Sequence, residues 1–248
     1  MPDPILSLTD VTVQFGALKA VDSVSMSLMP GERRAVLGPN GAGKTTLFNA
    51  ITGSIPPTSG RVIFDGVDMT RMSPQRRAYL GLARTFQITN LFGNLTVRQN
   101  IVLALCGARK TTFKFMRPLS GYGDIQTAAV AQLDRWNLAA SADLLVRNLS
   151  YGEQRQLEVV MALCGEPKLL LLDEPTAGLS PAETLRVVDM VRQLPRDITI
   201  LLIEHDMEVA FEIADRIVVM HQGQIVAQGD EAEIRNNKQV SDIYLGLE

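Results

Sequence analysis

Hydrophobic and polar residues alternate in two stretches within the first thirty residues of the chain. The first alternating set is Val11, Val13 and Phe15, and the second is Val24, Met26 and Leu28. A period of two places one face of a strand in a core and the other in solvent, so both stretches predict strands of an antiparallel β-sheet. Farther on, an Asp-Gly pair lies between short apolar segments, which predicts a β-hairpin over residues 61–69.

The period changes to that of helices from about residue 89 to residue 163. Thr96 and Gln99 have the spacing of a capping box, in which two side chains satisfy the first N–H groups of a helix. Residues 108–122 interrupt this pattern with four basic residues, two phenylalanines and no acid. We interpret this segment as a solvated loop in preference to a partner-binding surface, and both interpretations stay open.

Strands and helices alternate in the second half of the chain. The run Leu169–Leu172 is apolar without interruption, as expected of a parallel strand that is buried on both faces. The residues after it predict a helix, a strand, a second helix, a closing hairpin and a short helical tail. These elements are expected at residues 181–193, 198–203, 207–214, 216–228 and 240–245.

Residues 38–46 read Gly-Pro-Asn-Gly-Ala-Gly-Lys-Thr-Thr and carry the most informative motif. The pattern predicts a strand before them, over residues 34–37, and a helix after them that begins at Thr45 and ends at Gly53. Glycines at the first and sixth positions let backbone N–H groups approach phosphate oxygens, and a helix N-terminus favours negative charge. Lys44 can reach the β- and γ-phosphates, and the Thr45 hydroxyl group can bind Mg²⁺. The predicted nucleotide-contacting residues are Gly38, Asn40, Gly41, Ala42, Gly43, Lys44, Thr45 and Thr46.

Two acids, Asp173 and Glu174, directly follow the apolar run 169–172. Sheets of the α/β class bind ligands at the carboxyl ends of their parallel strands. Asp173 suits Mg²⁺ binding alongside Thr45, and Glu174 suits orientation or deprotonation of an attacking water molecule. The alternative, a solvated acidic pair, does not explain why a buried strand leads straight into both residues.

Residues 149–154, which read Leu-Ser-Tyr-Gly-Glu-Gln, form the second distinctive motif. Ser150 and Glu153 have capping-box spacing, so Ser150 is predicted to open a helix whose N-terminus can receive an anion. Capping alone gives no reason for Gly152, because glycine early in a helix weakens the helix.

These motifs and a later histidine, His205, stand in the order found in the ATP-binding cassette (ABC) ATPases, and the chain resembles that family over essentially its whole length. The resemblance implies an α/β fold: a P-loop NTPase core with a mostly parallel sheet, an N-terminal antiparallel β-subdomain and an inserted helical subdomain. It implies one ABC ATPase domain over residues 1–248. Residues 1–88 and 165–248 are expected to form the β-subdomain and the nucleotide-binding core, and residues 89–164 the helical subdomain.

The resemblance also assigns roles to single residues. Phe15 matches the aromatic residue that stacks on adenine, although its alternating pattern fits a core residue equally well. Gln87 matches the glutamine that contacts Mg²⁺ and water and relays the nucleotide state to the membrane partner, and His205 matches the histidine that contacts the γ-phosphate. The catalytic set is then Glu174, His205 and Gln87, and the metal set is Thr45, Gln87 and Asp173.

The Leu-Ser-Tyr-Gly-Glu-Gln motif matches the family signature, which serves the nucleotide of an opposing subunit. Its nucleotide-contacting residues are Ser150, Gly152 and Gln154. Catalysis is therefore expected to need a dimer that holds two ATP molecules. Ser180 stands where the family often has Asp, a change in the loop that is expected to communicate across that dimer.

Composition narrows the function classes. The net charge of −3 gives no general reason to expect nucleic acid as a partner. Cys106 and Cys164 lack disulfide or metal-site spacing, as expected of buried thiols in a reducing compartment. No secretory signal is visible, and no apolar run approaches the ~20 residues of a membrane-spanning helix. With the resemblance, these features predict a peripheral protein held at the cytoplasmic face of the inner or plasma membrane by permease subunits.

Several stretches resemble the cassette subunits of bacterial branched-chain amino acid importers, and the long segment between Leu105 and Asp124 resembles the larger of the two such subunits. The partners that this implies are transmembrane permease subunits, a second cassette of the same or another kind and, indirectly, a periplasmic binding protein. Importers of urea or amides and exporters of lipid or lipopolysaccharide remain alternatives. A soluble ABC ATPase is disfavoured, because those typically carry a long coiled coil or two cassettes, and the intact Glu174 and His205 disfavour a module without hydrolysis.

Overall fold

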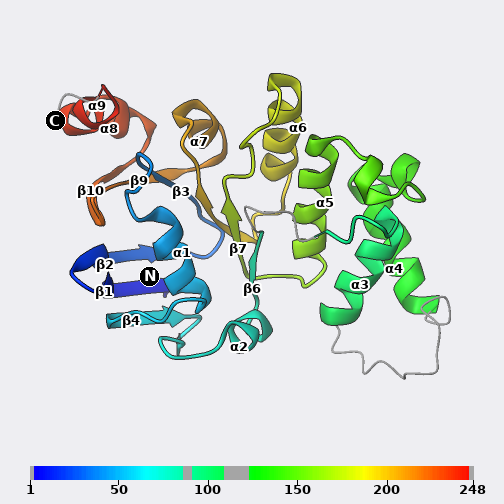
Figure 1. Cartoon of the computed structure of the whole chain (residues 1–248), viewed down its shortest axis with the longest axis horizontal. Helices are drawn as coiled ribbons and strands as arrows, with labels where there is room; N and C mark the ends of the chain where they lie inside the picture. Colours follow the sequence, from blue (N-terminus) through cyan, green and yellow to red (C-terminus); the bar gives the residue numbers. More distant parts are fainter. Residues whose placement is uncertain (1–2, 86–90, 109–122, 246–248) are drawn as a thin grey trace. The chain divides into compact units, whose positions relative to one another are not determined.

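The computed structural model describes residues 3–85, 91–108 and 123–245, which pack into two compact units (Figure 1). The first unit consists of Met1–Arg84, Lys168–Glu174 and Leu194–Glu248, and the second of Thr85–Pro167 and Pro175–Gln193. The sequence-based division groups residues 175–193 with the core. In the structure they pack with the helical segment, because helix α6 (Pro181–Arg192) contacts helix α5 (Tyr151–Leu163).

The N-terminal part of the first unit contains a four-stranded antiparallel sheet in the order β2-β1-β4-β5 (Figure 1). Its strands are β1 (Leu6–Phe15), β2 (Leu18–Leu28), β4 (Ser59–Phe64) and β5 (Val67–Asp68). The predicted hairpin is confirmed. Asp65 and Gly66 join β4 to β5 with φ angles of 48° and 75°, and a type I′ turn needs positive φ at both positions.

The predicted alternation holds in β2 but fails at the end of β1. The pairing of β1 with β2 shifts in register on both sides of Val13. Such a bulge adds a residue to one strand and re-aims the side chains that follow it. Thr12 is consequently buried although it is polar, and Phe15 is 51% exposed. Phe15 is therefore not a core residue.

The second sheet of this unit has six strands in the order β10-β9-β3-β8-β7-β6. All are parallel except the edge strand β10, so the predicted mostly parallel sheet is confirmed. Every residue of β3, β7 and β8 is buried, which explains the apolar runs at residues 35–37, 169–172 and 200–203 within them. The strands are β3 (Arg33–Leu37), β6 (Leu82–Arg84), β7 (Leu169–Asp173), β8 (Thr199–Ile203), β9 (Arg216–His221) and β10 (Gln224–Gly229).

Register brings the carboxyl ends of three central strands to one edge of this sheet. Ile203, the last residue of β8, is paired with Val36 of β3 on one side and with Asp173 of β7 on the other. The segments that follow these strands are residues 38–46, called the phosphate loop below, the acid at position 174 and the histidine at position 205. Three motifs that are far apart in sequence therefore emerge side by side.

Helix α1 (Lys44–Thr52) anchors the phosphate loop to the core. Leu47, Phe48 and Ile51 are fully buried in a cluster that includes residues of both sheets of the first unit. Burying a side chain of this size stabilises the fold by ~1.5–3 kcal/mol. The helix ends as predicted at Gly53, whose φ of 80° is left-handed. The other helices of this unit are α2 (Pro74–Tyr79), α7 (Met207–Ile213), α8 (Glu231–Arg235) and α9 (Lys238–Leu245).

The second unit is helical and contains α3 (Val97–Ala108), α4 (Gly123–Arg135), α5 and α6, with short 3₁₀ turns at Ala139–Ser141 and Val146–Asn148. The capping box predicted before α3 is confirmed, because the Thr96 N–H donates to Gln99 Oε1 at 2.8 Å and the Gln99 N–H donates to Thr96 Oγ1 at 3.2 Å. Of the segment 108–122, interpreted above as a solvated loop, Ala108 ends α3 and residues 109–122 lie outside the described residues. In the parts of the chain that are described, no helix has the length and apolar character needed to cross a membrane.

Candidate functional site

The backbone of the phosphate loop holds the ammonium group of Lys44. Lys44 is 5% exposed, and its Nζ donates to the carbonyl oxygens of Gly38 at 2.6 Å and Pro39 at 3.0 Å. Burial lowers the pKa of Lys44, and the carboxylates of Glu174, Asp173 and Glu204 act in the opposite direction. The lysine thus faces three acids, and its ammonium group is directed back at the loop that it would use to hold a phosphate.

The geometry of the loop requires glycine at the two positions singled out in the sequence. At Gly38 (φ 149°) a Cβ atom would lie 2.2 Å from the Met220 carbonyl oxygen, and at Gly43 (φ 99°) 2.2 Å from that of Ala20. Helix α1 begins directly after Gly43, without a side-chain cap and without an acid in its first turn. Its first N–H groups are therefore suited to an anion.

The other residues predicted from this loop differ in their exposure to solvent. Asn40, Gly41 and Thr45 are exposed, Thr46 is partly exposed, and Ala42 is buried. An exposed Thr45 places a hydroxyl oxygen at the start of α1, where the sequence predicts contact with Mg²⁺. A hydroxyl and a carboxylate are hard oxygen donors of the kind that Mg²⁺ prefers.

Asp173 is buried in an ion pair that the sequence did not predict. The carboxylate is 1% exposed and accepts a hydrogen bond from Arg84 Nη2 at 2.6 Å. Arg84 ends β6, and its Nη1 also donates to Asn49 Oδ1 of α1 at 2.6 Å. The guanidinium group therefore links the acid at the end of β7 to the helix that carries the phosphate loop.

Glu174 has an unusual backbone conformation. Its φ is 47°, in the left-handed region that non-glycine residues seldom adopt, and its N–H donates to the Ile203 carbonyl oxygen at 3.0 Å. Backbone strain of this kind costs roughly 1–3 kcal/mol and is concentrated at functional sites. Among the carboxylates that act on the pKa of Lys44, Glu174 has the largest influence. The strained turn thus brings this acid toward the lysine of the phosphate loop.

The end of β8 carries a second buried acid before the predicted histidine. Glu204 is fully buried, and its N–H donates to the Val36 carbonyl oxygen at 3.3 Å. The next residue, His205, has a side chain that is 56% exposed, with Nδ1 3.9 Å from Glu204 Oε2. The sequence contained a signal for Glu204, because an acid that directly follows a buried apolar strand has the same context as Asp173.

Of the two remaining predicted residues, Phe15 and Gln87, the structure describes only Phe15. Phe15, at the end of β1, is half-exposed, so an aromatic side chain is accessible to a ligand there. Gln87 lies outside the described residues.

The 149–154 motif lies in the second unit and starts α5 as predicted. The Ser150 N–H donates to Glu153 Oε2 at 2.9 Å, and the Glu153 N–H donates to Ser150 Oγ at 3.2 Å, which completes a capping box. Gln154 Nε2 donates to the Leu149 carbonyl oxygen at 3.2 Å. The Gly152 N–H donates to Oε1 of Glu183, a residue of α6, at 3.1 Å.

The structure supplies a reason for glycine at position 152. A Cβ atom there would lie 2.7 Å from Cγ and 2.9 Å from Oε1 of Glu183, closer than such atoms can approach. The sequence predicts Glu183 only as the capping-box partner of Ser180 at a helix start. It could not place the same carboxylate beside a glycine that lies 31 residues away along the chain.

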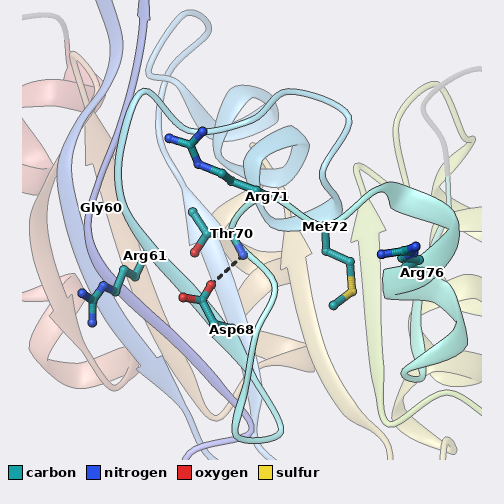
Figure 2. Close-up of a pocket in the computed structure, with 7 residues that line it drawn as sticks. All are labelled: Gly60, Arg61, Asp68, Thr70, Arg71, Met72 and Arg76. Carbon is teal, nitrogen blue, oxygen red and sulfur yellow. Dashed lines mark hydrogen bonds between the residues drawn. The ribbon is translucent and has the colours of Figure 1, made fainter.

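A pocket of about 610 Å³ on the first unit is separate from these residues (Figure 2). Its lining includes Arg61, Arg71 and Arg76, together with Asp68, which accepts a hydrogen bond from the Thr70 N–H at 2.9 Å. In Figure 2 the three guanidinium groups point in different directions. They do not converge on a common point as ligand-binding groups would.

Comparison with known proteins gives a consistent result. Residues 21–177 match the family model described as "ABC transporter". The chain is 39% identical to the high-affinity branched-chain amino acid transport ATP-binding protein LivG of Escherichia coli, with 99% of each chain covered. It is 37% identical to the corresponding protein BraF of Pseudomonas aeruginosa, again with 99% of each covered.

Solved structures agree in fold. The ADP conformation of MJ1267, an ATP-binding cassette of an ABC transporter, matches with a TM-score of 0.86 at 32% identity, covering 99% of this chain and 100% of that chain. A nucleotide-free ATP-binding cassette from an ABC transporter also matches with a TM-score of 0.86, at 31% identity, covering 97% of this chain and 98% of that chain.

Proposed function

The chain belongs to the ABC transporter family, and on that premise we propose that it is the ATP-hydrolysing subunit of an importer for branched-chain or related amino acids. The observation that carries the proposal is the common edge formed by the ends of β3, β7 and β8, where Lys44, Glu174 and His205 follow the strands. The names of the curated relatives support the choice of solute.

In this proposal the triphosphate of ATP binds along residues 38–46, and Lys44 moves from its own loop carbonyls to the phosphate oxygens. Phe15 stacks on the adenine ring, and His205 contacts the γ-phosphate. Mg²⁺ would be held by Thr45, Asp173 and Gln87, and it would neutralise charge on the phosphates.

Glu174 orients a water molecule and accepts its proton as the water oxygen attacks the γ-phosphorus atom, while the bond to the bridging oxygen of ADP breaks. The backbone N–H groups at the start of α1 stabilise the negative charge on the phosphate oxygens. Hydrolysis yields ADP and inorganic phosphate, and no covalent intermediate with the protein is needed.

The proposed working unit is a pair of cassettes on the cytoplasmic side of a membrane, bound to permease subunits. Ser150, Gly152 and Gln154 of one cassette would face the ATP bound by the other. A periplasmic binding protein would deliver the solute to the permease and act on this chain only indirectly.

Reconstitution tests this proposal. The chain is co-purified with its membrane subunits, placed in proteoliposomes with the solute-binding protein, and assayed for ATP-dependent uptake of labelled leucine, isoleucine and valine. We expect uptake that the Lys44→Ala variant abolishes and that Arg76→Ala, an exposed arginine outside the site, leaves intact. ATP hydrolysis that is stimulated by urea, an amide or a lipid, with no branched-chain amino acid moved, would contradict the assigned solute.

A further inference from the structure

The N-terminus of the signature helix α5 already has an anionic acceptor in this structure. Glu183 Oε1 accepts a hydrogen bond from the Gly152 N–H at 3.1 Å. Gly152 is one of the residues that the proposed function assigns to the nucleotide of the opposing cassette. A side-chain carboxylate thus binds a donor that is suited to a phosphate oxygen.

The carboxylate is held firmly by its other oxygen. Glu183 Oε2 accepts from Ser180 Oγ at 2.7 Å and from the Ser180 N–H at 3.0 Å, at the start of α6. One side chain therefore accepts N–H groups at the starts of two helices of the same unit, where the positive ends of the helix dipoles favour negative charge. The hydrogen bonds from Ser180, followed by that from Gly152, lower the pKa of Glu183 to about 2, so the group is ionised at neutral pH.

Local capping does not require the contact with Gly152. Glu233 forms the same kind of capping box at α8, where its Oε2 accepts from the Asp230 N–H at 2.8 Å and its own N–H donates to Asp230 Oδ1 at 2.9 Å. Both partners of that box belong to one helix start. Glu183 differs because its second oxygen reaches the start of another helix.

We propose that Glu183 is a built-in competitor of ATP, which occupies the Gly152 N–H of the signature in the open state and has to release it when two cassettes close around nucleotide. The proposal rests on the proposed function, because it takes the phosphate of an opposing ATP as the ligand that replaces the carboxylate. Its consequence is that Glu183 sets the ATP concentration at which closure occurs. Ser180, which replaces the family's common Asp, contributes by holding the carboxylate in this position.

The test compares three variants of the complete transporter complex: Glu183→Gln, Glu183→Asp and, as a matched control, Glu233→Gln. Gln removes the charge that opposes an incoming phosphate, and Asp keeps the charge but is too short to reach Gly152 while it binds Ser180. ATP hydrolysis is titrated with ATP for each complex, and thermal melting confirms that each variant is folded.

We expect both Glu183 variants to lower the half-saturating ATP concentration by about three- to tenfold, with little change in kcat, and Glu233→Gln to match the wild type. Damage to packing alone would instead lower kcat or raise the ATP requirement. A wild-type complex that hydrolyses ATP, together with Glu183 variants whose half-saturating concentration is unchanged or higher, would overturn the competitor role and leave the proposed function standing. A wild-type complex without hydrolysis would overturn both.

Discussion

Arg77 is a buried cation whose removal should destabilise the first unit and loosen the phosphate loop. It lies on α2, is fully buried, and donates to four backbone carbonyl groups. Nη1 bonds the carbonyl oxygens of Ala50 and Ile51 at 2.7 Å each, and Nε and Nη2 bond those of Met72 at 2.9 Å and Thr70 at 3.1 Å. The first two carbonyls belong to the last turn of α1, where a helix has no internal donors to offer.

The change in the free energy of unfolding that Arg77→Met causes is the balance of opposing effects. A hydrogen bond to a charged group contributes about 1.5–3 kcal/mol, and four are lost. Against this, burial lowers the pKa of Arg77 to about 10 from 12.5, which at about 1.4 kcal/mol for each pKa unit means that burying the charge costs roughly 3 kcal/mol. Methionine refills part of the space, and water can reach the carbonyls nearer the surface. The free energy of unfolding is therefore expected to fall by about 3–5 kcal/mol.

Thermal unfolding of Arg77→Met and Arg76→Met measures this effect. Arg76 is the exposed neighbour on the same helix, so it controls for loss of a positive charge and for helix propensity. We expect Arg77→Met to melt on the order of 10 °C below the wild type and Arg76→Met to stay within about 2 °C of it. ATP affinity should fall with Arg77→Met, because α1 carries Lys44 at its start. Equal melting temperatures for both variants would refute the capping role of Arg77.

Three other predictions follow from buried contacts. Gly43→Ala places a methyl group 2.2 Å from the Ala20 carbonyl oxygen, at a residue whose φ is 99°. Isothermal titration should therefore show that ATP affinity falls at least about tenfold. Unchanged affinity would contradict the loop geometry. Cys106 and Cys164 are buried, and burial raises the pKa of Cys164 to about 12. A thiol reagent at pH 8 should therefore react with these cysteines only after denaturant is added. Rapid labelling of the folded protein would count against the burial of both thiols. Arg84→Met removes the guanidinium group that pairs with the buried Asp173, and it should lower the free energy of unfolding, measured in urea, by about 3–5 kcal/mol. A second change, Asp173→Asn, should restore part of this loss. Fully additive losses would argue against the pairing.

The sequence predicted the fold where local pattern and burial agree. The apolar runs before Gly38, Asp173 and Glu204 form the central parallel strands, and parallel strands place their carboxyl ends at one edge. The phosphate loop was predictable because its glycines adopt positive φ angles, a local property, although the carbonyl oxygens that a Cβ atom would meet belong to distant residues. The Asp65-Gly66 hairpin was predictable for the same reason, since few residue pairs accept positive φ at both positions.

The parts that the sequence did not predict depend on long-range pairing. Arg84 and Asp173 are 89 residues apart, and Gly152 and Glu183 are 31 apart, so neither contact leaves a local pattern. Phe15 followed an alternating pattern that a bulge in β1 then breaks. Glu204 is the exception, because the rule that identified Asp173 also applies to it.

In the proposed mechanism Glu174, turned toward Lys44 by its left-handed backbone, activates the water that cleaves ATP. The decisive measurement is single-turnover hydrolysis, with ATP binding measured in parallel, for Glu174→Gln in the assembled complex. The proposed chemistry predicts binding close to that of the wild type and cleavage slower by about 10²–10⁴-fold. Near-normal cleavage, or loss of binding together with cleavage, would contradict it.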